Sequence, residues 1–286
     1  MGSCAMYFPA SPFDSDDAKL CAELVSSAYD MFSQWEKEKS PRKSDFKWTP
    51  ATVSLTLQYG APIWSDEVLL WGLIKLDVSP FAFIATNNGG DAFLVFRGTQ
   101  VYKGAVFPLS LIQGDIFADA DGFHTKYELT TGYGSVDQGF YDLYKSMRDE
   151  IASQLNALKG VKRLFITGHS LGCGLSTLCV PDIICNTDYK PSAMPVLHYN
   201  FASPRVGAPD FVTAYNANGV PTFRVVNTCD LVPNVPPACL KILLYEHVGI
   251  PICYTAQYQS VGGNHSLVSS YLYALNNPED PQGPLV

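Results

Sequence analysis

The sequence feature that most restricts the fold is the pentapeptide Gly168-His169-Ser170-Leu171-Gly172. An apolar run at 164–167 precedes it, and apolar residues at helical spacing follow it over 171–185. This pattern predicts a sharp turn from a strand into a helix, where larger residues in place of the glycines would crowd the backbone. The hydroxyl of Ser170 is then expected to project from the sheet edge as a nucleophile, and His169 to point elsewhere, because neighbouring side chains on such a turn diverge. The alternative is a glycine-rich turn with an ordinary hydroxyl, which needs no acid or histidine further along.

Helix and strand patterns alternate along the rest of the chain. Apolar residues at three- and four-residue spacings predict helices over 15–39, 139–158 and 209–215. Short apolar runs bounded by turn residues predict strands at 68–76, 81–85, 92–96, 164–167, 196–201 and 223–227. This alternation is typical of an α/β fold with a mostly parallel central sheet flanked by helices. Because 47% of the 286 residues are hydrophobic and 16% are charged, we expect one domain over residues 1–286, with 276–286 as a tail.

Charge and hydropathy limit the partners. A formal net charge of −8 disfavours nucleic acid and anionic lipid headgroups, because these carry charge of the same sign. No run reaches the roughly 18 apolar residues that a membrane-spanning helix needs, so no transmembrane segment is expected. The first six residues lack the basic and apolar regions of a signal peptide. We expect a soluble protein, whose compartment, secretion included, and oligomeric state stay open.

The cysteine pattern argues against a metal site. The eight cysteines do not form the C-x-x-C spacing of zinc ligands, so no metal or cofactor is expected. Cys173, Cys179 and Cys185 fall in a predicted helix, where buried thiols are as consistent with the pattern as bridges. Cys239 and Cys253 flank one irregular segment, and they are the pair that we expect to form a disulfide.

A serine nucleophile on a mostly parallel sheet needs an acid and then a histidine further along the chain. Asp230 follows the predicted strand at 223–227 and precedes a proline, so it lies where catalytic loops are found. Three other carboxylates are better explained as helix-capping or surface residues, namely Asp182, Asp188 and Asp210. We therefore expect Asp230 to be the acid.

Three histidines follow Ser170. His198 precedes the acid and belongs to a predicted buried strand, which excludes it. His265 lies in the loop 262–266, ahead of an apolar helix, where an imidazole is free to turn. His247 lies in an extended stretch and is interpreted as structural. His265 is therefore favoured as the base, with His247 kept as the alternative.

Several segments together resemble the class 3, or fungal lipase-like, family of α/β-hydrolases. They are Phe96-Arg97-Gly98-Thr99, Gly168-His169-Ser170-Leu171-Gly172, Phe201-Ala202-Ser203-Pro204-Arg205-Val206-Gly207, Asp230-Leu231-Val232-Pro233 and Asn264-His265-Ser266. Their order and spacing match over roughly residues 65–275, and the helix at 15–39 is similar to the N-terminal helix of the family. The resemblance implies an α/β-hydrolase fold in which the backbone N–H of Thr99 pairs with that of Leu171 to form the oxyanion hole. Arg97 is expected to be a structural ion-pair partner.

The resemblance also implies a short lid over about residues 100–115, a segment that is apolar and broken by glycine and proline. Its apolar side chains include Val106, Phe107, Leu109, Leu111 and Ile112. A loop packed into the core is the alternative. The segment departs from the family in lacking an Asn-Trp or Asp-Trp pair after the oxyanion residue. Asp137-Gln138-Gly139-Phe140 likewise stands where the family often has His-x-Gly-Phe.

These residues lead to a ranked set of functional hypotheses. The first is a lipase that hydrolyses acylglycerols at an oil–water interface through Ser170, His265 and Asp230 and an acyl-enzyme intermediate. The alternatives are a soluble carboxylesterase, such as a feruloyl esterase, and a phospholipase A1. A non-hydrolytic scaffold is disfavoured, because all three triad positions are filled. Acyl-chain length and stereochemical preference depend on pocket shape and stay open.

Overall fold

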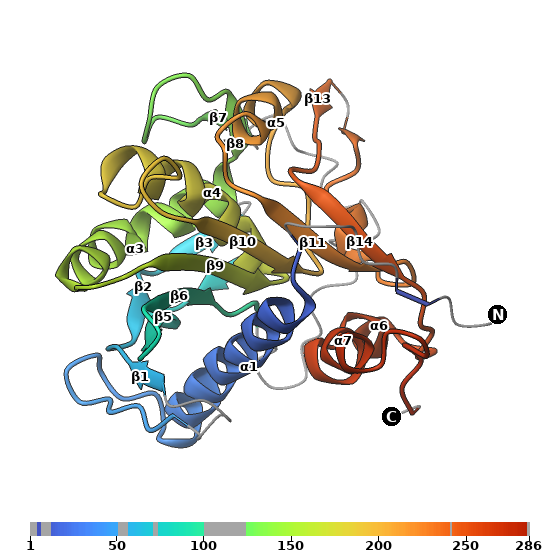
Figure 1. Cartoon of the computed structure of the whole chain (residues 1–286), viewed down its shortest axis with the longest axis horizontal. Helices are drawn as coiled ribbons and strands as arrows, with labels where there is room; N and C mark the ends of the chain where they lie inside the picture. Colours follow the sequence, from blue (N-terminus) through green and yellow to red (C-terminus); the bar gives the residue numbers. More distant parts are fainter. Residues whose placement is uncertain are drawn as a thin grey trace.

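The computed structural model describes residues 5–6, 13–50, 57–70, 74–99, 124–240 and 242–284. Its centre is one eight-stranded sheet, whose strands are β1 (Leu57–Tyr59), β2 (Ile63–Ser65), β5 (Ser79–Asn87), β6 (Asp91–Phe96), β9 (Arg163–His169), β10 (Val196–Phe201), β11 (Thr222–Asn227) and β14 (Ile250–Tyr254). The strand order is β1-β5-β6-β9-β10-β11-β14, and β2 also pairs with β5 (Figure 1). The neighbours from β6 to β14 are parallel, whereas β1, β2 and β6 pair antiparallel with β5. The expected α/β fold with a mostly parallel sheet is confirmed.

Helices cover both faces of this sheet, which explains why its central strands are buried along almost their whole length. On one face lie α3 (Gln138–Ala157), α4 (Leu171–Asn186) and α5 (Pro209–Asn216), and on the other lies α1 (Ser15–Lys37) (Figure 1). Neighbouring residues of a strand serve opposite faces, as Phe93 packs on the α1 side and Leu94 on the side of α3 and α4. Near α1 the chain ends in α6 (Val261–His265), a π-helix (Leu267–Leu272) and α7 (Tyr273–Asn276).

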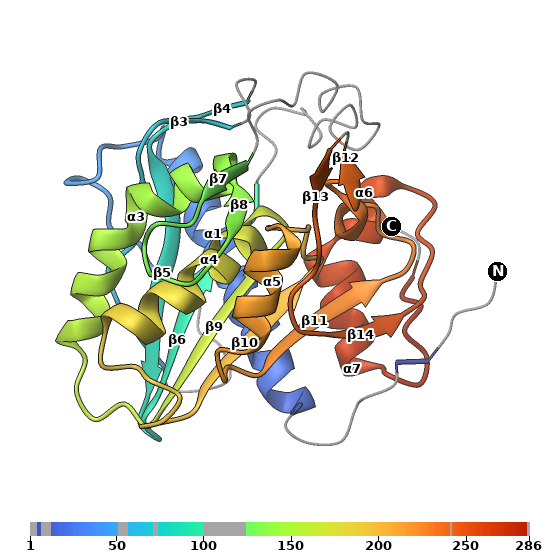
Figure 2. The same ribbon diagram turned by 90° about the horizontal axis from the view of Figure 1, so that it is seen from above.

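Three short hairpins were not foreseen as such. They are β3 (Val68–Leu70) with β4 (Ile74–Leu76), β7 (His124–Lys126) with β8 (Ser135–Asp137), and β12 (Cys239–Leu240) with β13 (Leu243–Leu244). The prediction of one strand over 68–76 is therefore wrong, because the chain reverses between β3 and β4. Strands of two or three residues are too short to show a periodicity in sequence. Figure 2 places β3–β4 and β12–β13 at the same margin of the molecule, the one towards which β9 and β10 run.

The expected disulfide is also wrong. Cys239 and Cys253 are not joined, because Cys239 lies in the β12–β13 hairpin whereas Cys253 lies in β14, which pairs with β11 in the central sheet. The two cysteines are close in the sequence, but the hairpin and the central sheet are separate sheets, so the fold does not join the two thiols. Among the helices that the structure describes, none has the length and apolar character required to cross a bilayer.

Candidate active site

The turn between β9 and α4 holds Ser170 in a strained backbone conformation. Its φ of 57° and ψ of −126° lie outside the regions that residues with side chains prefer. A Cβ atom on Gly168 would lie 2.5 Å from the carbonyl oxygen of Gly172, and one on Gly172 would lie 2.5 Å from the carbonyl oxygen of Arg97. Neither glycine can therefore be replaced without moving backbone. The turn brings the end of β6 against the start of α4.

The three residues expected to form the triad lie in one hydrogen-bonded line. Nε2 of His265 is 2.9 Å from Oγ of Ser170, and its Nδ1 is 2.8 Å from Oδ2 of Asp230. Because an ionised carboxylate only accepts, Nδ1–H donates to Asp230, and Nε2 is left to accept from the serine hydroxyl. Asp230 and Ser170 are 1% and 2% exposed, whereas the side chain of His265 is 17% exposed, so the two ends of the line are shielded from water and the ring is partly open to it.

Two of these three residues follow the strands predicted for them, and the third lies on an element that was not predicted. Ser170 follows β9 and Asp230 follows β11, as expected for loops at the carboxyl edge of a parallel sheet. His265 ends the short helix α6, whereas a loop was predicted. Two glycines and an asparagine in this five-residue helix hid its helical character.

The alternative residues lie in other environments. Nε2 of His247 is 2.8 Å from the carbonyl oxygen of Pro233, and burial, followed by the positive charge of Arg224, lowers the pKa of His247 to about 3. His198 is fully buried between Tyr215 and the hydroxyl of Ser176, with hydrogen bonds of 2.6 and 2.8 Å. Both histidines therefore have structural partners.

The competing carboxylate Asp182 is also engaged elsewhere. Its oxygens accept from the guanidinium of Arg148 at 2.8 and 3.0 Å and from the hydroxyl of Tyr144 at 2.7 Å. These contacts tie α4 to α3, which is a packing role.

Asp230 has a further partner that the sequence did not reveal. The hydroxyl of Tyr271 donates to Oδ2 of Asp230 at 2.6 Å, the same oxygen that accepts from His265, and the N–H of Val232 donates to Oδ1 at 2.9 Å. Burial, together with the charge of Asp230, raises the pKa of Tyr271 well above its usual value, so the phenol stays protonated as a donor. In the sequence Tyr271 fitted only an apolar helix face, and the π-helix register was not visible.

His169 does not point away from the site, and that expectation is wrong. Its ring packs against the ring of His265 with centroids 4.6 Å apart and an interplanar angle of 35°. Nε2 of His169 lies 3.0 Å from the backbone carbonyl of His265, and Nδ1 lies 2.7 Å from the hydroxyl of Tyr29 on α1. Burial first, and His265 second, lower the pKa of His169 well below its usual value, so the ring is neutral.

The hydrogen bonds around His169 have one consistent direction. The carbonyl of His265 only accepts, so Nε2–H of His169 is the donor and Nδ1 accepts from the Tyr29 hydroxyl. The Tyr29 oxygen in turn accepts from the N–H of Gly98 at 3.1 Å. A chain of buried hydrogen bonds thus connects the residue before Thr99 with the backbone of His265.

Thr99 and Leu171, the two residues expected to form the oxyanion hole, follow the end of one element and begin another at the same edge of the sheet. Thr99 follows the end of β6, and Leu171 is the first residue of α4, whose N-terminus favours negative charge. The hydroxyl Oγ1 of Thr99 is buried and has no hydrogen-bond partner among the residues that the structure describes. A buried hydroxyl without a partner is costly, so this group has donor capacity left for a bound oxygen.

Arg97 does not have the expected ion-pair role. Within the described residues it forms no ion pair, and its guanidinium lies 4.0 Å from the ring centroid of Phe32 and 3.9 Å from that of Phe81. It donates to the carbonyl oxygens of Pro80 and Gly98 and to the hydroxyl of Ser79. Burial lowers its pKa to about 9. The rings of Phe32 and Phe81 and three neutral oxygen atoms thus surround the guanidinium in place of the expected carboxylate partner. The hydrogen bond from Arg97 holds the Gly98 carbonyl in place.

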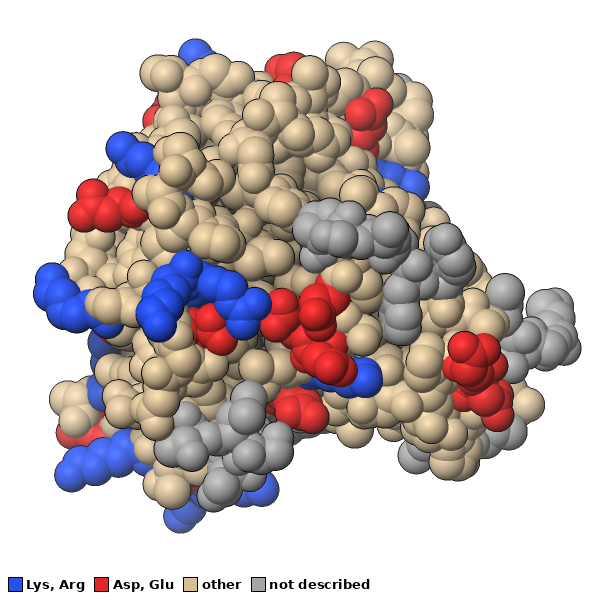
Figure 3. Space-filling view, viewed as in Figure 1, with Lys and Arg blue, Asp and Glu red and all other residues tan. Residues whose placement is uncertain are grey.

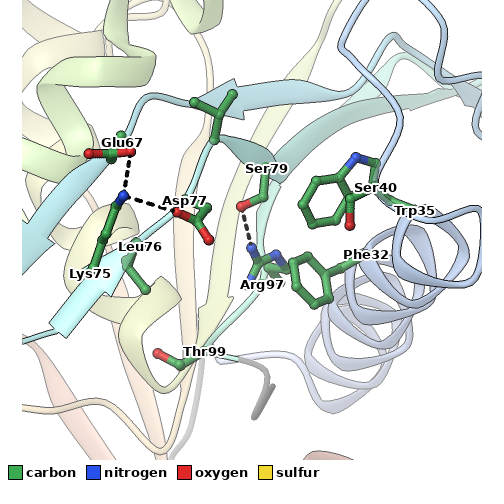
Figure 4. A pocket seen from close by; sticks show the side chains of 11 residues that line it. Phe32, Trp35, Ser40, Glu67, Lys75, Leu76, Asp77, Ser79, Arg97 and Thr99 are labelled. Atoms are coloured by element: carbon green, nitrogen blue, oxygen red, sulfur yellow. Dashed lines mark hydrogen bonds and ion pairs between the residues drawn. The ribbon is translucent and has the colours of Figure 1, made fainter. Parts of the chain in front are cut away.

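A cavity of about 530 Å³ opens beside Thr99. Figure 4 shows Phe32 and Trp35 from α1 on one side and the β3–β4 residues on the other, with Thr99 at the lower end. Lys75 is 2.9 Å from a carboxylate oxygen of Glu67 and 3.7 Å from one of Asp77. The expected lid at about 100–115, with Val106, Phe107, Leu109, Leu111 and Ile112, lies outside the described residues. Among the described residues no group of histidines, cysteines and carboxylates could hold a metal ion.

Comparisons with known proteins agree with this geometry. The family profile described as lipase (class 3) matches residues 93–240. A lipase from Rhizomucor miehei is 30% identical over 177 residues, which are 60% of this chain and 45% of that protein. Phospholipase A1-II 1 from Oryza sativa subsp. indica is 36% identical over 210 residues, 67% of this chain and 52% of that protein. A solved structure of Rhizomucor miehei triacylglyceride lipase has a TM-score of 0.56 at 22% identity, covering 87% of this chain and 82% of that one. The chain spans about half the length of the curated relatives it matches.

Proposed function

This chain belongs to the class 3 lipase family, and we propose that it is a serine carboxylic-ester hydrolase that acts on acylglycerols. The observation that carries the proposal is the continuous line from the Ser170 hydroxyl through His265 to Asp230. Another serine–histidine contact within the described residues joins Ser176 to His198, but that line ends at the hydroxyl of Tyr215 and not at a carboxylate. A line that ends at a carboxylate is what an alcohol needs in order to attack an ester near neutral pH.

The proposed reaction proceeds in two halves. Oγ of Ser170 attacks the ester carbonyl carbon while Nε2 of His265 takes the hydroxyl proton, and Asp230 stabilises the imidazolium that results. The tetrahedral oxyanion accepts from the N–H groups of Thr99 and Leu171 and from the Thr99 hydroxyl. His265 then protonates the leaving alcohol, and an acyl group remains on Ser170. Water, deprotonated by His265, attacks this acyl ester and releases the carboxylic acid.

A lipid substrate is favoured by the cavity beside Thr99. Phe32 and Trp35 line one side of it, and an acyl chain would bury its apolar surface against them. The other side is mixed, with Leu76 and Val78 beside the charged residues of the β3–β4 hairpin and its flanks. A phospholipase A1 is the second candidate, because a rice protein of that name is more similar in sequence than the Rhizomucor lipase is. A feruloyl esterase or another soluble carboxylesterase is the third.

The test measures purified protein against three substrates: triglyceride emulsions, phosphatidylcholine vesicles, and p-nitrophenyl esters below and above their solubility limit. A lipase is expected to hydrolyse emulsified triglyceride fastest and to show a rate increase above the solubility limit, whereas a plain esterase shows none. Faster release of fatty acid from phosphatidylcholine would favour the phospholipase.

The matched variants are Ser170→Ala and Ser203→Ala, since both serines are buried and only Ser170 contacts His265. Ser170→Ala is expected to lose activity by about 10⁶-fold and to lose labelling by a fluorophosphonate. Ser203→Ala is expected to keep both. Hydrolysis that survives Ser170→Ala would refute the proposal.

A further inference from the structure

Large apolar side chains are exposed in two places: shortly after two of the triad residues in the sequence, and on the β12–β13 hairpin. Leu231, which directly follows the triad aspartate, is 40% exposed, and Val268, three residues after the triad histidine, is 55% exposed. Ile242, between β12 and β13, is 90% exposed, and Leu244 on β13 is 49% exposed. An isoleucine this exposed at a hairpin tip gains nothing for folding, so its side chain is available for a partner.

The β12–β13 hairpin lies on the side of the molecule that presents Ser170. In Figure 2 it stands at the upper margin, as does the β3–β4 hairpin on the opposite side of the same margin. The parallel strands β9, β10 and β11 run towards this margin, and Ser170 and Asp230 follow two of them. The two hairpins and the ends of the strands that precede Ser170 and Asp230 therefore lie at one margin of the molecule.

Few charged residues follow the triad aspartate along the chain, and the two that occur up to residue 278 stand at the hairpin: Lys241 lies between β12 and β13 in the sequence, and Glu246 follows β13. From residue 231 to residue 278 the sequence contains only two formally charged residues, Lys241 and Glu246, although the whole chain has 19 basic and 27 acidic ones. The side seen in Figures 1 and 3 is different, because charged side chains of both signs gather there over the starts of β9 and α1. Arg163, for example, pairs with Asp91 and Asp17 on that side.

We propose that the β12–β13 hairpin is a fixed anchor that inserts Ile242 and Leu244 into a lipid surface without net charge. The inference rests on the proposed function, because an enzyme for lipid esters must reach its substrate in an aggregate. A surface poor in charge loses little hydration energy when it enters lipid, and the net charge of −8 opposes an anionic bilayer. Burying one isoleucine strengthens partition about 10- to 100-fold.

The two hairpins then differ in role. Glu67, Lys75 and Asp77 of β3–β4 and its flanks are exposed and paired with one another, so they remain at the level of the headgroups. The β12–β13 hairpin enters the apolar layer on the other side of the triad. The molecule is thereby held with the edge of the sheet at which Ser170 and Asp230 lie towards the lipid.

The experiment compares binding to uncharged phosphatidylcholine vesicles by sedimentation with hydrolysis of a monomeric soluble ester, p-nitrophenyl butyrate. The test variant is the double substitution Ile242→Ser with Leu244→Ser. The control is Ile250→Ser. Ile250 is 50% exposed, but it is the first residue of β14, so it lies where the parallel strands begin and not where they end. The double variant is expected to bind vesicles at least tenfold more weakly, and Ile250→Ser within twofold of the unsubstituted protein. Both are expected to keep soluble-ester hydrolysis.

Four results would overturn the inference. They are unchanged vesicle binding by the double variant, equal weakening by Ile250→Ser, a parallel loss of soluble-ester hydrolysis, and tighter binding when phosphatidylglycerol replaces part of the phosphatidylcholine. A dimer that the double substitution dissociates, with vesicle binding unaltered, would identify a second copy as the occupant instead. Failure of the unsubstituted protein to hydrolyse any ester would refute the proposed function and leave the vesicle result standing.

Discussion

Tyr29 is the residue whose replacement tests most directly whether α1 contributes to catalysis. The substitution Tyr29→Phe removes one hydroxyl and keeps the ring that packs edge-on against His169. Two buried groups then lose their partners: Nδ1 of His169, which accepts at 2.7 Å, and the N–H of Gly98, which donates at 3.1 Å. Because the change creates no large cavity, its effects come from these two hydrogen bonds.

The magnitude follows from the cost of leaving buried polar groups unpaired. At about 1 to 2 kcal/mol for each group, the free energy of unfolding is expected to fall by about 2 to 4 kcal/mol. For a chain of this length that lowers Tm by about 3 to 7 °C. The kcat is expected to fall about tenfold or more with KM nearly unchanged, because misplacing a catalytic group by less than 1 Å is costly and Tyr29 does not line the cavity.

The control is Tyr199→Phe. Tyr199 is fully buried, and its hydroxyl accepts from the N–H of Asp14, the N-cap of the same helix α1. This variant is expected to lose stability and to keep kcat. Steady-state kinetics on a soluble ester at 25 °C, below both melting transitions, compare the two. If Tyr29→Phe melts earlier but turns over as fast as Tyr199→Phe, the hydrogen-bond chain is structural only, and the reasoning fails.

Three further predictions follow from single contacts. Thr99→Val is expected to lower kcat about 10- to 1000-fold without loss of stability, because the buried hydroxyl has no partner within the described residues before substrate binds. Steady-state kinetics measure the first effect and thermal melting the second. Tyr271→Phe is expected to lower kcat about tenfold by removing one donor to Asp230, measured against Tyr254→Phe, whose hydroxyl contacts Ser270 instead. Burial lowers the pKa of His198 to about 3, below the roughly 6.5 of the unfolded chain, so its stability contribution is complete above pH 6.5 and declines by about 1.4 kcal/mol per pH unit as the pH falls towards 3. Urea unfolding between pH 7 and 4.5 should show this decline, and His198→Gln should lessen it.

The sequence sufficed for the central strands β5, β6, β9, β10 and β11 and for the residues that contact one another as the candidate triad, but not for β1, β2 and β14 at the sides of the sheet. Long apolar strands such as β6 and β9 show their burial directly, since both faces are covered. Ser170 and Asp230 were found because each follows such a strand, and chain order then left few histidines to consider. The chemistry of ester hydrolysis restricts the residue types at these positions.

Residues that depend on packing between distant elements were not predictable in the same way. Tyr29 and His169 are 140 positions apart, and only the placement of α1 on the sheet brings them together. The Tyr271 contact depends on a π-helix, whose register no apolar periodicity indicates. Arg97 was expected to be a structural ion-pair partner, whereas its guanidinium lies over the rings of Phe32 and Phe81, which are far from it in the sequence.

The burial of His169 has a consequence for catalysis, because its ring packs against the ring of His265. In the proposed mechanism His265 becomes positively charged when it takes the proton from Ser170, and a second charge on a ring 4.6 Å away would oppose that step. Full burial keeps His169 neutral, and its two hydrogen bonds leave Nε2–H pointing at the carbonyl of His265. A neutral ring with fixed donors can position the base without repelling it. The desolvation that lowers the pKa of His169 therefore supports the imidazolium beside it, and α1, through Tyr29, holds the tautomer that makes this arrangement work.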